Sequence, residues 1–325
     1  MRGATVLGVG SMIGAGIFAL LGEAGAIAGS AVWISFLIGG VVAGLLGYVC
    51  SKLGMRYPSS GGLITYLVEG FGRGRLVGVT SWLGYISAVV VVTAMVAVSF
   101  GGYAVSLFVG DGGWSGWDNV LITALLVVMC ALIGVFGTLT VTEVIGYGET
   151  AIAEAARPTL GDAGFTIMAV AALLSTAGCT NATLYASDNL TGMLAQERFF
   201  PPFFGPGSRL GRHSGLLITT ALVLVIANLG TLGAIASVGS AVSMMVFVLV
   251  AAAGWRRRRE TGSNPAIVLA AIAVILVVLG FFVADTVENA PETFGAIVGV
   301  GLLAIVLDAV FRRTSPEPQP TVKEV

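Results

Sequence analysis

Residues 8–29 read "GVGSMIGAGIFALLGEAGAIAG", and seven of these 22 residues are glycine. The stretch is apolar enough to cross a membrane, yet each glycine costs a helix about 1 kcal/mol relative to alanine. Four of the glycines lie between positions 8 and 16, on both sides of the small polar residue Ser11. A helix interrupted there would expose backbone groups that attract carboxylates and cations, so a break in this span would suit a zwitterionic ligand.

Helix packing is the alternative explanation of the glycines, because small residues let membrane helices approach closely. The Gly-x-x-x-Gly pairs at 25–29 and 40–44 favour packing. Both interpretations stay open for Gly14 and Gly16. A dinucleotide-binding loop is excluded, because the spacing is wrong and no acidic ribose ligand follows.

The composition predicts an all-α polytopic membrane protein. Of the 325 residues, 56% are hydrophobic and only 10% are charged, against about 25% charged in soluble domains. Backbone N–H and C=O groups inside a lipid bilayer must form hydrogen bonds within the protein, which favours helices. A helix needs about 20 residues to cross the bilayer, and the uncharged runs of this sequence are long enough for that. One histidine and three scattered cysteines offer no metal or disulfide pattern and argue against an enzyme.

The uncharged runs predict nine candidate segments, and basic residues predict their orientation. If every basic loop is cytoplasmic, 15 of the 16 basic residues lie inside and only Arg157 lies outside. The segment 119–137 conflicts with this division, because acidic loops precede and follow it, so it would start and end outside. The predicted segments are 4–27, 30–51, 76–108, 119–137, 164–190, 215–233, 237–255, 266–284 and 293–311.

Two stretches resemble amino acid permeases of the amino acid–polyamine–organocation superfamily. Residues 10–73 contain "GSMIGAGIF" and "YPSSGGLITY", which are similar to the first two helices of that family and the loop that follows them. Residues 171–205, "AALLSTAGCTNATLYASDNLTGMLAQERFFPPFFG", are similar to the eighth helix and its exit loop. The resemblance implies a five-plus-five inverted repeat, in which the first and sixth helices are each broken at mid-membrane.

The same resemblance implies the site residues. The first break would hold the substrate carboxylate, with the substrate-binding residues Ser11, Ile13, Gly14, Ala15, Gly16 and Ile17. A cation site would combine Gly10 and Ile13 with Ser175 and Thr176 of the eighth helix. The alternative for both hydroxyls is a bond back to their own helix. No cofactor is expected, and the coupling ion, H⁺ or Na⁺, stays open.

The chain departs from the family at one place. No stretch is similar to the aromatic-rich sixth helix of the family. A stretch similar to the start of the family's fourth helix is followed directly by one similar to the end of its seventh helix. The expected fold is therefore an incomplete five-plus-five transporter with about 8–9 transmembrane segments. We expect one membrane domain over 1–312, made of 1–118, two fused half-helices at 119–137, and 138–312, with a disordered cytoplasmic tail at 313–325.

The expected function is transport of amino acids across the cytoplasmic membrane, impaired by the missing helices. The alternative is a transport-inactive membrane remnant or interaction protein. An amino acid and the lipid bilayer are the expected partners, with no nucleic acid, and the composition suggests a bacterial source. Asp188 is expected at the membrane interface, and His213 in a solvated loop. Trp82 and Tyr85 are expected in the cavity or the aromatic belt, and Trp33 in the belt or in packing.

Overall fold

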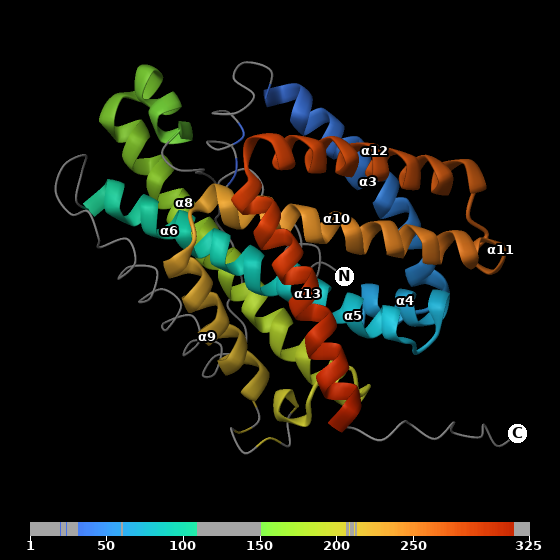
Figure 1. The fold of residues 1–325 in the computed structure, drawn as a ribbon. Coiled ribbons are helices and arrows are strands. Elements are labelled where there is room, and N and C mark those ends of the chain that lie inside the picture. Colours follow the sequence, from blue (N-terminus) through green and yellow to red (C-terminus); the bar gives the residue numbers. More distant parts are fainter. Residues whose placement is uncertain are drawn as a thin grey trace, which may run out of the picture.

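The computed structural model describes residues 20, 24, 32–59, 61–108, 151–205, 208, 211 and 213–314, and all regular elements in them are helices (Figure 1). The long helices are α3 (Val32–Arg56), α8 (Ala151–Gln196), α10 (Leu232–Arg256), α12 (Pro265–Asn289) and α13 (Pro291–Thr314). A further long helix is continuous through α5 (Arg75–Gly84), η3 (Tyr85–Val91) and α6 (Val92–Phe108). The shorter helices are α4 (Leu63–Phe71), η4 (Pro202–Phe204), α9 (Ser214–Leu229) and α11 (Arg258–Thr261).

The described helices confirm an all-α polytopic membrane protein. Six segments are long and apolar enough to cross a bilayer: Trp33–Arg56, Arg75–Ala104, Asp162–Gln196, Leu232–Arg256, Pro265–Asn289 and Pro291–Phe311. Helix α9 is apolar but has only 16 residues. The predicted segments 4–27 and 119–137 lie outside the described residues.

Several predicted boundaries differ from the observed ones. Helix α8 has 46 residues and extends beyond 164–190 at both ends. The basic loop 52–75 contains α4, whose Ile64 and Leu67 lie one turn apart and are both buried. Helix α13 ends at Thr314, two residues into the predicted tail, and the rest of the tail lies outside the described residues.

Local signals fix the turn between α10 and α12. Gly262 has a φ of 62° and closes α11 in the left-handed conformation that glycine adopts without strain. Two residues later, the Asn264 side chain accepts a hydrogen bond from the Ala266 N–H at 2.9 Å, and Pro265 opens α12. An asparagine cap followed by proline is a common helix start. The turn therefore positions the start of α12 close to the end of α10.

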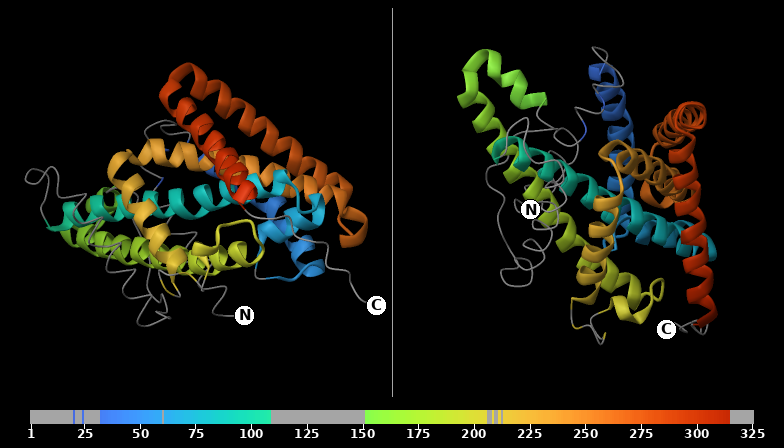
Figure 2. Two further views of the ribbon diagram at one scale, coloured as in Figure 1. Left: turned by 60° about the horizontal axis from the view of Figure 1, so that its bottom comes forward. Right: turned by 60° about the vertical axis from the view of Figure 1, so that its left-hand side comes forward.

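Helix α10 lies at the centre of the described bundle. It contacts α12, α4, η3, α13, α3 and α6. Figure 2 shows the order of the layers, from α12 and α13 through α10 and α5–α6 to α8. Small residues on α10 permit this packing, since a Cβ at Gly254 would lie 2.6 Å from Cγ1 of Val49 on α3, and one at Gly239 would lie 2.7 Å from Cγ1 of Val91 in η3.

Candidate functional site

The π-helix η3 lies near the middle of its membrane span. It begins ten residues after Arg75, the start of the span, which places it about 15 Å along the helix at 1.5 Å per residue. The hydrocarbon core is about 30 Å thick, so η3 lies at about half its depth. π-Helical turns are rare and occur frequently at functional sites. We therefore take η3 and the helices beside it as the candidate site.

Among the described residues, four buried hydroxyls on η3, α6 and α8 have no hydrogen-bond partner. They belong to Ser87, Ser99, Ser175 and Thr180, and each of these residues is at most 1% exposed. Other hydroxyls in these helices bond back to a carbonyl one turn earlier, as Thr93 does to Val89 at 2.6 Å. A buried polar group left unpaired costs about 1–3 kcal/mol. These four oxygens are therefore available to a water molecule, a cation or a polar ligand.

The two predicted cation ligands of α8 differ in their bonding. Ser175 and Thr176 are both buried, but only the Ser175 hydroxyl is unpaired. The Thr176 hydroxyl donates to the Ala172 carbonyl at 2.8 Å, which is the alternative expected for such residues. Its oxygen keeps acceptor capacity, since a hydroxyl has two lone pairs.

The other predicted site residues, Gly10, Ser11, Ile13, Gly14, Ala15, Gly16 and Ile17, lie outside the described residues. The structure therefore describes the α8 side of the predicted cation site and leaves the substrate-binding stretch undescribed. Among the residues it describes, no group of three His, Cys, Asp or Glu side chains is placed to hold a metal ion.

An aromatic cluster of Trp82, Tyr85, Phe200 and Phe204 packs beside η3. The Trp82 and Phe200 rings stack with centroids 3.8 Å apart, and Phe204 meets both Trp82 and Tyr85 edge-on. The Tyr85 hydroxyl lies 2.8 Å from the Thr219 hydroxyl of α9. Trp82 and Tyr85 are 4% and 1% exposed, so these two residues do not belong to an interfacial aromatic belt. Trp33, by contrast, is 64% exposed, as a belt residue is.

The segment from α8 to α9 is tied to its neighbours by a hydrogen-bond contact and an ion pair. His213 Nδ1 lies 2.8 Å from Asp188 Oδ2, and Arg73 pairs with Glu197. Asp188 is therefore partnered near the end of α8, and His213 is not simply solvated. Sequence reasoning missed this pair, because the two residues are 25 positions apart and no local pattern joins them.

Comparison with known proteins decides the family. The family profile described as "Amino acid permease" matches residues 1–148 and again 148–303. The chain belongs to the amino acid permease family. With six apolar spans in the part that the structure describes, it is therefore a multi-pass membrane protein of a transporter family.

Three relatives illustrate the range of similarity. The inner membrane transport protein YbaT of Escherichia coli is 26% identical over 411 positions, covering 94% of each chain. The uncharacterized protein MJ0609 of Methanocaldococcus jannaschii is 25% identical over 418 positions, covering 96% of this chain and 95% of the relative. The serine/threonine exchanger SteT of Bacillus subtilis is 28% identical over 248 positions, covering 69% of this chain and 52% of the relative.

The lengths of these alignments bear on the missing helices. The alignment with YbaT has 411 positions, which exceeds the 325 residues of this chain by 86, so at least 86 positions of that alignment are gaps in this chain. The family profile also matches in two parts that meet at residue 148. Both findings agree with an internal segment that the relatives have and this chain lacks.

Proposed function

We propose that the chain descends from a secondary active amino acid transporter and transports its substrate poorly or not at all. The observation that carries the proposal is the gap of at least 86 positions against a relative that is otherwise covered nearly end to end. A transporter of this fold moves one bundle of helices against another around a site between two broken helices. A chain that lacks one of those helices retains only half of that site.

The half-site that remains would bind the substrate carboxylate at Ser11, Ile13, Gly14, Ala15, Gly16 and Ile17. The unpaired Ser175 hydroxyl supports a cation site beside it, with Thr176, Gly10 and Ile13 as further ligands. Hydroxyl and carbonyl oxygens are the ligands that hard cations prefer. The chain would lie in the cytoplasmic membrane, because its basic loops would then face the cytoplasm.

The packing of α6 along α8 supports the loss of transport. The four unpaired hydroxyls lie on these helices and on η3, buried at 2% exposure or less. Polar groups of this kind normally face water or a ligand, because leaving them unpaired is costly. Because α6 packs along α8, protein covers these hydroxyls in this arrangement of the described helices.

The second candidate is a membrane protein with an interaction role and no transport activity.

The DNA sequence of the gene tests whether the protein itself is shortened or whether this sequence omits part of a longer protein. The proposal predicts an in-frame junction within the fused half-helices expected at 119–137. Coding sequence for at least 86 further residues at that place, in another reading frame, would instead restore an intact permease and contradict it.

A further inference from the structure

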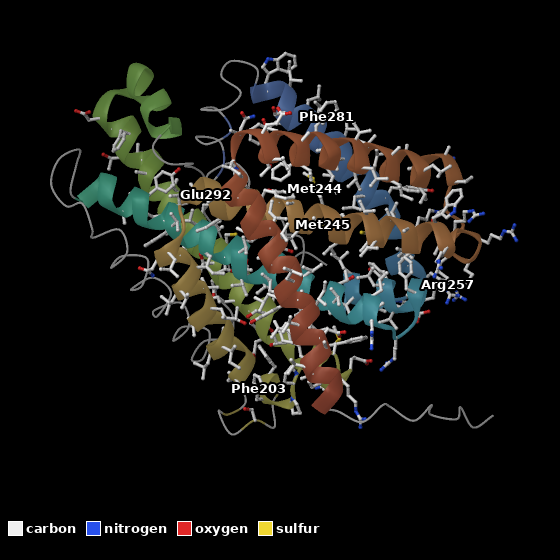
Figure 3. All side chains as sticks on the ribbon, viewed as in Figure 1. Phe203, Met244, Met245, Arg257, Phe281 and Glu292 are labelled. Carbon is white, nitrogen blue, oxygen red and sulfur yellow. The ribbon has the colours of Figure 1, made fainter. Side chains whose placement is uncertain are left out.

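Basic side chains gather where α3, α10 and α11 meet. Residues 48–57 and 255–264 together carry six cations and a single carboxylate, Glu260. Helix α11 contacts α3, and the pKa of Glu260 on α11 is lowered by hydrogen bonds from Tyr57 and Arg257 and, to a smaller extent, by the charge of Arg56 on α3. Figure 3 shows this end of the molecule around Arg257, whereas the labelled Phe281 lies near the other end of α12.

Two of the six cations stabilise the fold. Arg257 Nε donates to the Glu69 carbonyl at 2.8 Å, and Arg256 Nη1 donates to the Gly70 carbonyl at 3.2 Å. These carbonyls belong to the last turn of α4, where helix carbonyls lack partners within the helix. Both arginines therefore cap α4 and hold it to the end of α10.

The single carboxylate of the region is already engaged. Glu260 accepts hydrogen bonds from the Tyr57 hydroxyl at 2.5 Å and from Arg257 Nη1 at 2.6 Å. Among the described residues, no acidic side chain lies within ion-pair distance of Lys52, Arg56 or Arg259. We name these three residues the basic cluster. Among the described residues, these three side chains thus have no direct carboxylate partner, and Glu260 feels the charge of Arg56 only from beyond ion-pair distance.

Aromatic residues beside the basic cluster mark the level of the lipid headgroups. The Arg258 guanidinium lies 4.0 Å from the centroid of the Trp255 ring, and Tyr48 accepts a hydrogen bond from the Asn264 N–H at 2.9 Å. Trp and Tyr with one apolar and one polar end favour the membrane–water interface. The Tyr48–Asn264 bond also holds the start of α12 against α3.

Apolar side chains extend from the basic cluster toward the membrane interior. Helices α3 and α12 contact each other, and each exposes large hydrophobic residues along its length. Val41 and Met55 on α3 are 52% and 69% exposed, and Leu269 and Leu276 on α12 are 49% and 48% exposed. A cationic end and an apolar surface thus lie on the same pair of helices.

We propose that the basic cluster binds the phosphate of an anionic phospholipid, with Lys52, Arg56 and Arg259 around the headgroup and the acyl chains along α3 and α12. Basic residues between membrane helices attract anionic headgroups in this way. Arginine matches phosphate geometry especially well, because its donors form a fork. The site does not depend on transport and would persist in an inactive chain.

Native mass spectrometry of the full-length chain in detergent tests the proposal. An equimolar mixture of phosphatidylglycerol and phosphatidylcholine should give preferential binding of phosphatidylglycerol. The variant R56Q/R259Q should weaken phosphatidylglycerol binding about 30-fold, because each basic residue near an anionic surface contributes roughly a fivefold factor. The charge-conserving variant R56K/R259K should retain most of the affinity.

The matched control removes two other arginines, Arg75 and Arg198, which also have no ion pair among the described residues. R75Q/R198Q should leave lipid preference unchanged, and the melting temperature of each lipid-free variant checks folding. Equal binding of both lipids by the native chain, or an unchanged preference in R56Q/R259Q, would overturn the proposal. Displacement of the lipid by millimolar inorganic phosphate would overturn the lipid assignment in favour of a free anion.

Discussion

Gly70 of α4 lies directly against Ala253 of α10. A Cβ placed at Gly70 would be 2.4 Å from the Cβ of Ala253 and 2.8 Å from its Cα. No rotamer relieves such a contact, since the obstructing atoms belong to the backbone and the first side-chain carbon. This close approach lets the arginine caps at the end of α10 reach the last carbonyls of α4.

Replacing Gly70 by alanine should therefore destabilise the protein. Overpacking at a closed contact costs about 1–3 kcal/mol, and the gain in helix propensity offsets at most about 1 kcal/mol of it. Thermal unfolding in detergent measures the effect. The matched control is Gly47→Ala on α3, where a Cβ meets nothing within 4 Å. Equal melting temperatures for the two variants would show that α4 does not dock on α10 as described.

The stack of Trp82 on Phe200 should couple the two residues energetically. Phe200 is fully buried, so Phe200→Ala should cost about 3–5 kcal/mol. A double-mutant cycle with Trp82→Ala should give a coupling energy of about 0.5–1.5 kcal/mol, as aromatic pairs do. Exposed Phe203, whose ring contact among the described residues is with Phe204, provides the comparison and should couple weakly with Trp82. Additive losses for Trp82 and Phe200 would mean that the stack is absent in solution.

The unpaired hydroxyl of Ser175 should respond to cations. If Ser175 is a ligand, sodium should raise the melting temperature of the native chain relative to choline, and Ser175→Ala should remove that increase. Ser99 is the control, because its hydroxyl is also buried and unpaired but is not a predicted ligand. Ser99→Ala should keep the sodium response and remain at least as stable as the native chain. The same sodium response in all three proteins would exclude Ser175 from a cation site.

The contact of Tyr57 and Arg257 with Glu260 should make stability depend on pH. Hydrogen bonds from Tyr57 and Arg257 lower the pKa of Glu260 below its ordinary value of 4.5. A lowered folded pKa gives stabilisation that is present above the unfolded pKa and is lost as pH falls through the folded value. Melting temperatures from pH 6 downward should therefore fall in the native chain below about pH 4.5, and fall less in Glu260→Gln and Tyr57→Phe. Parallel curves for the three proteins would contradict this assignment.

The sequence predicts the membrane helices well, because long uncharged runs are a local property. The predicted segment 266–284 starts one residue after the first residue of α12 and ends five residues before its last residue, Asn289. Contacts between distant residues were not predictable in this way. The pairing of Trp82 with Phe200 and of Asp188 with His213 depends on how η3 and α9 pack against α8 and the turn after it.

The candidate site was predictable only in part. The hydroxyls of Ser175 and Thr176 were found through the resemblance of one helix to a family, but their different bonding needed coordinates. Ser99 and Thr180 were not predicted, since a buried serine or threonine in an apolar run usually bonds to its own helix. The substrate-binding residues around Gly14 stay a prediction.

Uptake of labelled amino acids is the decisive test of the proposed loss of transport. The purified chain and SteT would be reconstituted in parallel into liposomes loaded with serine, and the initial uptake of labelled serine, threonine, alanine, arginine and lysine would be measured. We predict that uptake by the chain stays close to that of empty liposomes for every amino acid, while SteT takes up serine and threonine. Uptake by the chain at a rate comparable to that of SteT would show that the chain is a working transporter.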